Sequence, residues 1–179
     1  MRQWLYNGGL ATVASYIRDY TDEFGQEDSE QLRLQVIDDK EWMERLPSHI
    51  VLDKWRLVHA GYDPRIELDS QEEDTLLWIR RPFHRAEKPI DEQRTVVFGH
   101  TPTMNLNTTP GTEKWGHPWF SKVQLNDGRS ASVGLDTCLF HEERQPAMLT
   151  AYNLQTLEVV RIARVEQWNE DIRESVKKV

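Results

Sequence analysis

The chain has 179 residues, of which 38% are hydrophobic and 29% charged, and this composition predicts a soluble globular protein. The net charge of −8 argues against a nucleic-acid partner, because most of the surface would repel a phosphate backbone. A cytoplasmic protein without a membrane partner is expected, because the sequence has no bilayer-spanning apolar run, no signal-peptide pattern, and a single cysteine, Cys138.

Helical spacing of apolar residues predicts a first helix over residues 9–20. The residues at that spacing are Leu10, Val13, Ala14 and Ile17. Residues 21–31 are acidic and polar, which indicates a loop or a frayed helix. A short helix is expected over residues 38–46, where Pro47 ends it.

The middle and the end of the chain are rich in β-formers. The predicted strands span residues 49–52, 55–59, 95–99, 131–136, 147–153 and 157–163. Asp53-Lys54 suits a tight turn between the first two strands, and residues 154–156 would join the last two as a hairpin. The strand at 95–99 is continuously apolar, which is typical of a strand buried on both faces.

A second helix is expected over residues 70–80, because Ser70 and Glu73 form a capping-box pattern. Residues 105–130 are rich in glycine, proline and tryptophan with little periodicity, so they predict a long surface loop. The last residues, 165–179, predict a charged C-terminal helix.

Two of the six histidines share one setting, in which an apolar strand is followed by histidine and then a turn. His59 follows residues 55–58, and His100 follows residues 96–99. Neighbouring strand ends can bring such residues into one site, and neutral imidazole is a common metal ligand. A histidine at a strand end can equally be a hydrogen-bonded loop residue, and spacing assigns no third or fourth ligand.

Other site patterns are missing from the sequence. It has no CxxC or HExxH metal motif, no GxSxG, no P-loop and no GxGxxG, and Cys138 has no evident catalytic partner. The remaining histidines, at positions 49, 84, 117 and 141, lie in polar or proline-flanked segments.

Four segments in order carry a family resemblance. They are VHAGYDP (58–64), DTLLWIRRPF (74–83), VVFGHTP (96–102) and SVGLDT (132–137), and the opening WLYNGGLATVASY adds to them. Together they resemble the C-terminal half of bacterial metallophosphoesterases of the serine/threonine protein phosphatase family, the calcineurin-like phosphoesterases. The resemblance implies an α/β fold, α+β by element order, that is part of a four-layer α-β-β-α sandwich.

The resemblance also implies a site. The family holds two divalent metal ions, manganese first, with iron or zinc as alternatives, and His59 and His100 match two ligands of one ion. Arg80 matches an arginine that contacts the substrate phosphate, with Arg81 as the alternative. An ordinary salt bridge to Glu72 or Glu73 is the competing interpretation of Arg80.

For two residues close to these motifs we expect structural roles instead of catalytic or substrate-binding ones. Asp136, within SVGLDT, is expected to hold a turn rather than to act in catalysis. Trp78, within LLWIR, is expected in the core rather than at a substrate.

The family's first three motifs, DxH, GDxxDRG and GNHE or GNHD, do not occur in the sequence. Residues 1–179 are therefore expected to form a single incomplete metallophosphoesterase domain, a hydrolase by resemblance but inactive alone. Its substrate would be a phosphorylated protein or a small phosphoester, and its partner a missing N-terminal half or a second copy. The alternatives are a symmetrical dinucleoside tetraphosphate hydrolase and a non-catalytic interaction module with Trp115 and Trp119 as contact residues.

Overall fold

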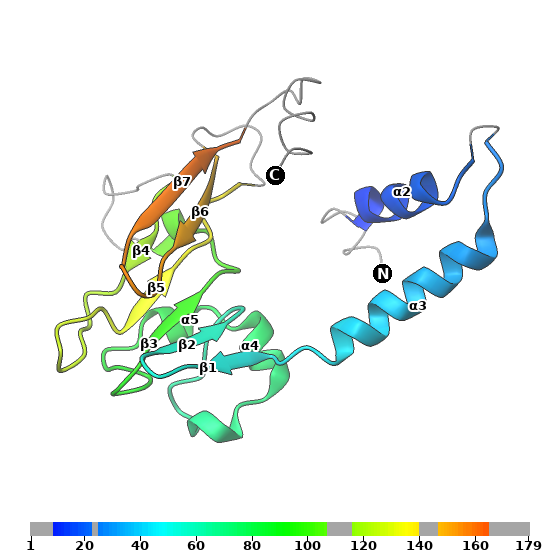
Figure 1. Ribbon diagram of the computed structural model, residues 1–179. Helices are drawn as coiled ribbons and strands as arrows, with labels where there is room; N and C mark the ends of the chain where they lie inside the picture. The colour runs from blue at the N-terminus through cyan, green and yellow to red at the C-terminus, as the bar shows by residue number, and fades with distance from the viewer. Residues whose placement is uncertain (1–8, 23–24, 107–115, 140–146, 165–179) are drawn as a thin grey trace. The chain divides into compact units, whose positions relative to one another are not determined.

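A computed structural model describes residues 9–22, 25–106, 116–139 and 147–164 (Figure 1). The chain divides into two compact units, Met1–Pro47 and Ser48–Val179. We call them the N-terminal unit and the C-terminal unit. None of the helices in the described ranges is long and apolar enough to cross a membrane.

The N-terminal unit contains two helices, α2 (Leu10–Asp19) and α3 (Ser29–Glu44). The first agrees with the prediction. The second begins well before residue 38, because the side chain of Asp28 caps it by accepting a hydrogen bond from the Gln31 N–H at 3.0 Å. The prediction of a short helix over 38–46 was therefore wrong at its N-terminal end.

A five-stranded mixed sheet forms the centre of the C-terminal unit. Its strands are β1 (His49–Val51), β2 (Trp55–Val58), β3 (Thr95–Phe98), β4 (Trp119–Phe120) and β5 (Ser132–Gly134), in the spatial order β1-β2-β3-β5-β4. The three inner strands β2, β3 and β5 are parallel, whereas β1 and β4 pair antiparallel at the two edges. The carboxyl ends of the inner strands consequently lie along one edge of the sheet.

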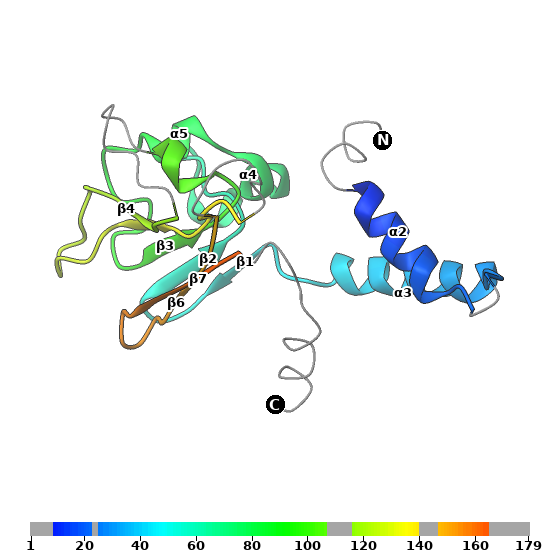
Figure 2. The ribbon, with the colours of Figure 1, turned by 90° about the horizontal axis from the view of Figure 1, so that it is seen from above.

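Different elements cover the two faces of this sheet, as Figure 2 shows. Two short helices, α4 (Glu73–Trp78) and α5 (Arg81–His84), pack on one face through Leu76 and Phe83. The hairpin of β6 (Met148–Tyr152) and β7 (Val159–Ala163) approaches the other face, where Tyr152 packs near Val97 and Val133. The fold is thus a mixed α and β architecture with few helices.

The expected capping box at Ser70 was wrong. Ser70 ends a 3₁₀ helix, η2 (Leu68–Ser70), and α4 begins only at Glu73, with no side-chain cap. Gln71 separates the two elements with an extended backbone, and its side-chain amide donates to the carbonyls of Asp63 and Ile66. These tertiary hydrogen bonds interrupt the helix that the local pattern indicates.

The predicted surface loop over 105–130 was wrong in part. Residue 106 ends a second 3₁₀ helix, η3 (Thr103–Leu106), and Trp119 starts β4 and lies edge-on to Phe98 with ring centroids 6.1 Å apart. Leu125 is buried as well. Trp115 and the C-terminal helix expected over 165–179 lie outside the described residues.

Candidate functional site at the strand ends

The two singled-out histidines meet at the carboxyl edge of the sheet. His59 directly follows β2, and His100 follows β3 after Gly99, so the two residues leave neighbouring parallel strands. Nε2 of His59 lies 3.2 Å from Nδ1 of His100, and their ring centroids are 5.0 Å apart. The sequence prediction that these side chains share one site agrees with this geometry.

Main-chain hydrogen bonds hold the two loops in register. The N–H of Gly99 donates to the carbonyl of His59 at 2.9 Å. His100 has a φ of +61°, and the N–H of Thr101 donates to the carbonyl of Gly99 at 2.6 Å, which closes a tight three-residue turn around His100. A non-glycine residue in this region carries conformational strain, and strained residues of this kind cluster at functional sites.

Arg80 joins the histidine pair from the α4–α5 junction. Its Nη1 lies 3.4 Å from Oγ1 of Thr101, the residue after His100. Its positive charge also helps to lower the pKa of His100, which places the guanidinium close to that imidazole. The ion pairs of the described residues do not include Arg80, so the salt bridge to Glu72 or Glu73 does not form.

The surroundings of His100 favour its neutral form. Burial is the largest cause of its lowered pKa, and the charge of Arg80 and the neighbouring His59 add to the effect. Its Nε2 atom is buried and lacks a hydrogen-bond partner of regular geometry, although the main chain of Trp78 favours protonation. Neutral imidazole is the form that binds a metal ion, so the electrostatics suit a ligand.

The pair fits two ligands of one metal ion but not a complete centre. Two imidazole nitrogens that share an ion at about 2.0–2.1 Å lie roughly 3–3.4 Å apart. The 3.2 Å separation of Nε2 of His59 and Nδ1 of His100 falls in that range, although it also suits a direct hydrogen bond. Within the described residues, no group of three or more histidine, cysteine or acidic side chains could hold an ion.

The predictions for two residues beside the site, Trp78 and Asp136, turn out differently. Trp78 was expected in the core, but 68% of it is exposed, and its ring lies edge-on to His100 at 5.6 Å. The short α4 ends at Trp78, which leaves its ring outside the packed face. Asp136 follows β5 at the same edge and accepts the N–H of Cys138 at 3.2 Å, which agrees with the turn-holding role expected for it.

The sequence patterns did not single out His84. It ends α5 four residues after Arg80, and that i, i+4 spacing is the signal that could have pointed to it. Its ring stacks on Phe98 at 5.6 Å. Burial first, and then the charges of Arg80 and His100, lower its pKa to about 4, so His84 is neutral near pH 7.

His84 should make the protein less stable in mild acid. Its pKa is lower in the folded chain than the ordinary value of 6.5, so only the unfolded chain takes up this proton between about pH 6.5 and 4. Acidification from pH 7 to 4.5 should therefore lower the free energy of unfolding by about 2 kcal/mol more in the native protein than in His84→Phe. Urea denaturation across this pH range measures the difference, with the exposed His117→Phe as control. Parallel pH profiles for all three proteins would contradict the assignment.

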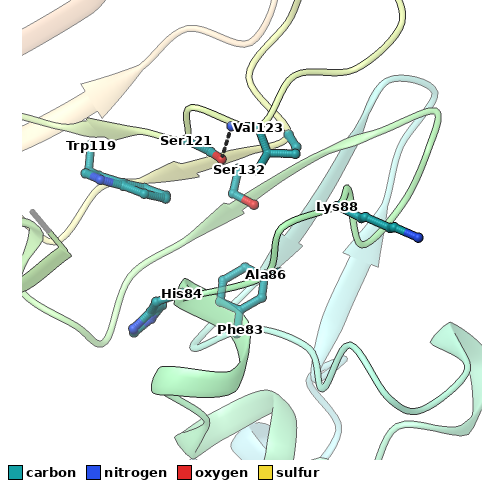
Figure 3. Close-up of a pocket in the computed structure, with 9 residues that line it drawn as sticks. Phe83, His84, Ala86, Lys88, Trp119, Ser121, Val123 and Ser132 are labelled. Atoms are coloured by element: carbon teal, nitrogen blue, oxygen red, sulfur yellow. Dashed lines mark hydrogen bonds between the residues drawn. The ribbon is translucent and has the colours of Figure 1, made fainter. Parts of the chain in front are cut away.

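A shallow pocket lies beside α5, between that helix and strands β4 and β5 (Figure 3). Phe83, His84, Trp119 and Ser132 line it, and the Lys88 side chain extends away from His84 and Trp119. The lining includes none of the three predicted site residues. The pocket is therefore distinct from the site of the histidine pair.

Comparison with known proteins identifies no relative of this chain. No protein-family model, curated protein or solved structure matches the chain significantly.

Proposed function

We propose that this chain carries part of the metal centre of a metallophosphoesterase of the serine/threonine protein phosphatase type. The observation that supports the proposal best is the 3.2 Å separation of Nε2 of His59 and Nδ1 of His100 at the ends of adjacent parallel strands. Arg80 lies beside the pair through Thr101. The order of helices, mixed sheet and hairpin is compatible with part of an α-β-β-α sandwich.

In this proposal His59 and His100 hold one divalent ion through Nε2 and Nδ1. When bound, a pair of such ions supplies an activated water and compensates charge on the phosphoryl oxygens. Arg80 is suited to the phosphate itself, because a planar guanidinium can donate two hydrogen bonds to neighbouring phosphate oxygens. The low pKa of His100 keeps its imidazole available as a ligand at neutral pH.

The reaction needs ligands beyond this pair. A zinc site normally takes three or four protein ligands, and the described residues bring only two together. We propose that carboxylates of a second polypeptide supply the others. The proposal therefore includes negligible phosphatase activity for residues 1–179 expressed alone.

Metal titration of the 179-residue chain tests the proposal. The native chain should bind Zn²⁺ or Mn²⁺ weakly by calorimetry, and His59→Ala and His100→Ala should each abolish that binding. The exposed His117→Ala is the matched control and should bind as the native chain does. An assay with p-nitrophenyl phosphate and Mn²⁺ should show no turnover above the blank.

One result would count against this function, and a second would count against the expected inactivity of the chain alone. Metal binding that is undetectable, or unchanged in both site variants, would favour a non-catalytic interaction module. Clear turnover by the chain alone that disappears in His100→Ala would show that the two described ligands are not the whole centre.

A further inference from the structure

Strand β7 forms an open edge of the β6–β7 hairpin (Figure 1). Within the described residues it pairs only with β6, and every residue of β7 is exposed. The other edge of the hairpin is covered, because the N–H of Met148 in β6 donates to the carbonyl of Thr137 at 3.4 Å, and Cys138 forms a β-bridge with Met148. An uncovered edge is a template for pairing with another strand, and proteins normally protect such edges.

The hydrogen-bond register shows which main-chain groups of β7 face outward. At the turn of the hairpin, the N–H of Asn153 donates to the carbonyl of Glu158 at 2.9 Å. Bonded pairs alternate along an antiparallel ladder, so every second residue after Glu158 bonds to β6. The residues between them, Val159, Arg161 and Ala163, direct their N–H and C=O groups away from β6. A row of donors and acceptors therefore lies along the free edge.

The side chains of β7 indicate which kind of strand fits this edge. Val160 and Ile162 are 57% and 61% exposed, and Leu149 lies opposite Ile162 on the same apolar face. Arg161 is the one charged residue of β7. Its Nη1 donates to the carbonyl of Gly116 at 2.9 Å, but the ion pairs of the described residues do not include it. The edge thus combines apolar side chains with a positive charge that no carboxylate compensates.

We propose that β7 binds an extended strand of another polypeptide, with an acidic residue opposite Arg161 and apolar residues on both sides of that acid. The main chain of the added strand would pair with Val159, Arg161 and Ala163, and its carboxylate would compensate the guanidinium. Its apolar side chains would extend the face formed by Val160 and Ile162. This interaction does not depend on the proposed metal site, because it uses neither the histidine pair nor Arg80.

A second copy of this chain fits the edge less well. When two β7 strands pair antiparallel, all three outward residues are paired only in the register centred on Arg161. That register places two arginines directly opposite each other, and like charges in this position are destabilising. A register centred on Val160 or Ile162 separates the arginines but leaves one of the three outward residues unpaired. A strand with an acid at the central position avoids both costs.

Titration of the ¹⁵N-labelled 179-residue chain with a capped peptide, TTVEVTT, tests the proposal by NMR. The peptide should shift the amide signals of Val159, Arg161 and Ala163 and slow their hydrogen exchange. TTVKVTT places a lysine opposite Arg161 and should bind about 2–5-fold more weakly. Unshifted signals at millimolar peptide, or equal binding of the two peptides, would overturn the proposal. Protection of the same amides by a higher protein concentration without peptide would instead assign the edge to a second copy.

Two substitutions separate the charge from the main-chain pairing. Arg161→Glu should reverse the preference, so that TTVKVTT binds more tightly than TTVEVTT. Val159→Pro removes one outward N–H at the first residue of β7 without removing a bond to β6, and should weaken both peptides about 2–10-fold. Lys122→Glu, which changes the net charge as Arg161→Glu does but lies outside the hairpin, is the control and should keep the native preference. A reversal in Lys122→Glu as well would show that net charge rather than Arg161 selects the peptide.

Discussion

Gly61→Ala is expected to lower the free energy of unfolding by about 3–5 kcal/mol, because it combines backbone strain with a steric clash. Gly61 has a φ of +149°, which side-chain-bearing residues rarely adopt. A Cβ atom there would lie 2.3 Å from Cδ1 of Phe83, and that ring is itself confined because Phe83 is buried and packs edge-on against Phe98 at 4.9 Å. Chemical denaturation followed by tryptophan fluorescence measures the loss.

Two comparisons separate the strain from the clash. Gly128→Ala has a φ of +85° but no atom within 4 Å of the new Cβ, so it should cost only about 1 kcal/mol. Phe83→Leu in the Gly61→Ala background should recover part of the loss, with a coupling of about 1–2 kcal/mol between the two substitutions. Equal losses for Gly61→Ala and Gly128→Ala would show that Phe83 yields to the added methyl group.

The same substitution should disturb the candidate metal site. Gly61 lies two residues after His59, and the only way to relieve the clash without moving Phe83 is to shift the loop that starts at His59. A shift of the His59 imidazole would lower the affinity of the folded protein for the metal ion. The metal titration proposed above can measure this under conditions in which Gly61→Ala remains folded.

The strands of this fold could be predicted because each is marked locally. Residues 95–99 form an unbroken apolar run between polar segments, and Asp53-Lys54 provides a turn signal at the first hairpin. In the structure, β3 is buried at every position and β1 pairs antiparallel with β2. Period, β-branched residues and turn chemistry are properties of short segments, so they can be read without knowing the tertiary fold.

The elements that were missed depend on distant contacts. β4 has only two residues, and it exists because Trp119 and Phe120 pair with β5, more than ten positions along the chain. Gln71 breaks the expected helix through side-chain hydrogen bonds to carbonyl groups earlier in its own loop. Neither contact produces a periodic pattern in the sequence. The local pattern therefore indicates a loop at β4 and a helix at Gln71.

The candidate site was predictable only in its strand-end residues. His59 and His100 share a recognisable setting, and parallel pairing of β2 with β3 brings them together. Trp78 was misplaced because an apolar residue in a helix usually faces the core, whereas α4 is too short to bury it. His84 carried no strand-end signal, since its position follows from the packing of α5 against Phe98.

Asp91→Asn should be the second strongly destabilising change, with a loss of about 3–5 kcal/mol in the free energy of unfolding. Asp91 is 6% exposed, and its carboxylate accepts Nε of Arg56 at 2.6 Å in a buried ion pair. The neutral amide leaves the charge of Arg56 uncompensated, although only 9% of the Arg56 side chain is exposed. Replacing one partner of a buried pair costs far more than the pair itself is worth, because the other charge stays desolvated.

The pH dependence of stability provides an independent readout of Asp91. Burial alone would raise its pKa, but Arg56 and the N–H groups of Gln93 and Arg94 outweigh burial and hold the pKa below the ordinary 3.8. The stabilisation from Asp91 is therefore complete above about pH 4 and is lost as the pH falls through the lower folded-state pKa. Asp91→Asn should remove this part of the acid transition, because the amide does not titrate.

Asp127→Asn is the matched control for Asp91→Asn. It also removes a carboxylate from an arginine, with Oδ2 of Asp127 2.7 Å from Nε of Arg129, but 52% of the Asp127 side chain is exposed. Exposed ion pairs contribute about 0–1 kcal/mol, since water and salt screen the charges. Similar losses for the two variants in 0.15 M salt would mean that burial does not determine the strength of these pairs. A loss confined to Asp91→Asn would locate the stabilising charge at the buried Arg56–Asp91 pair beside β2.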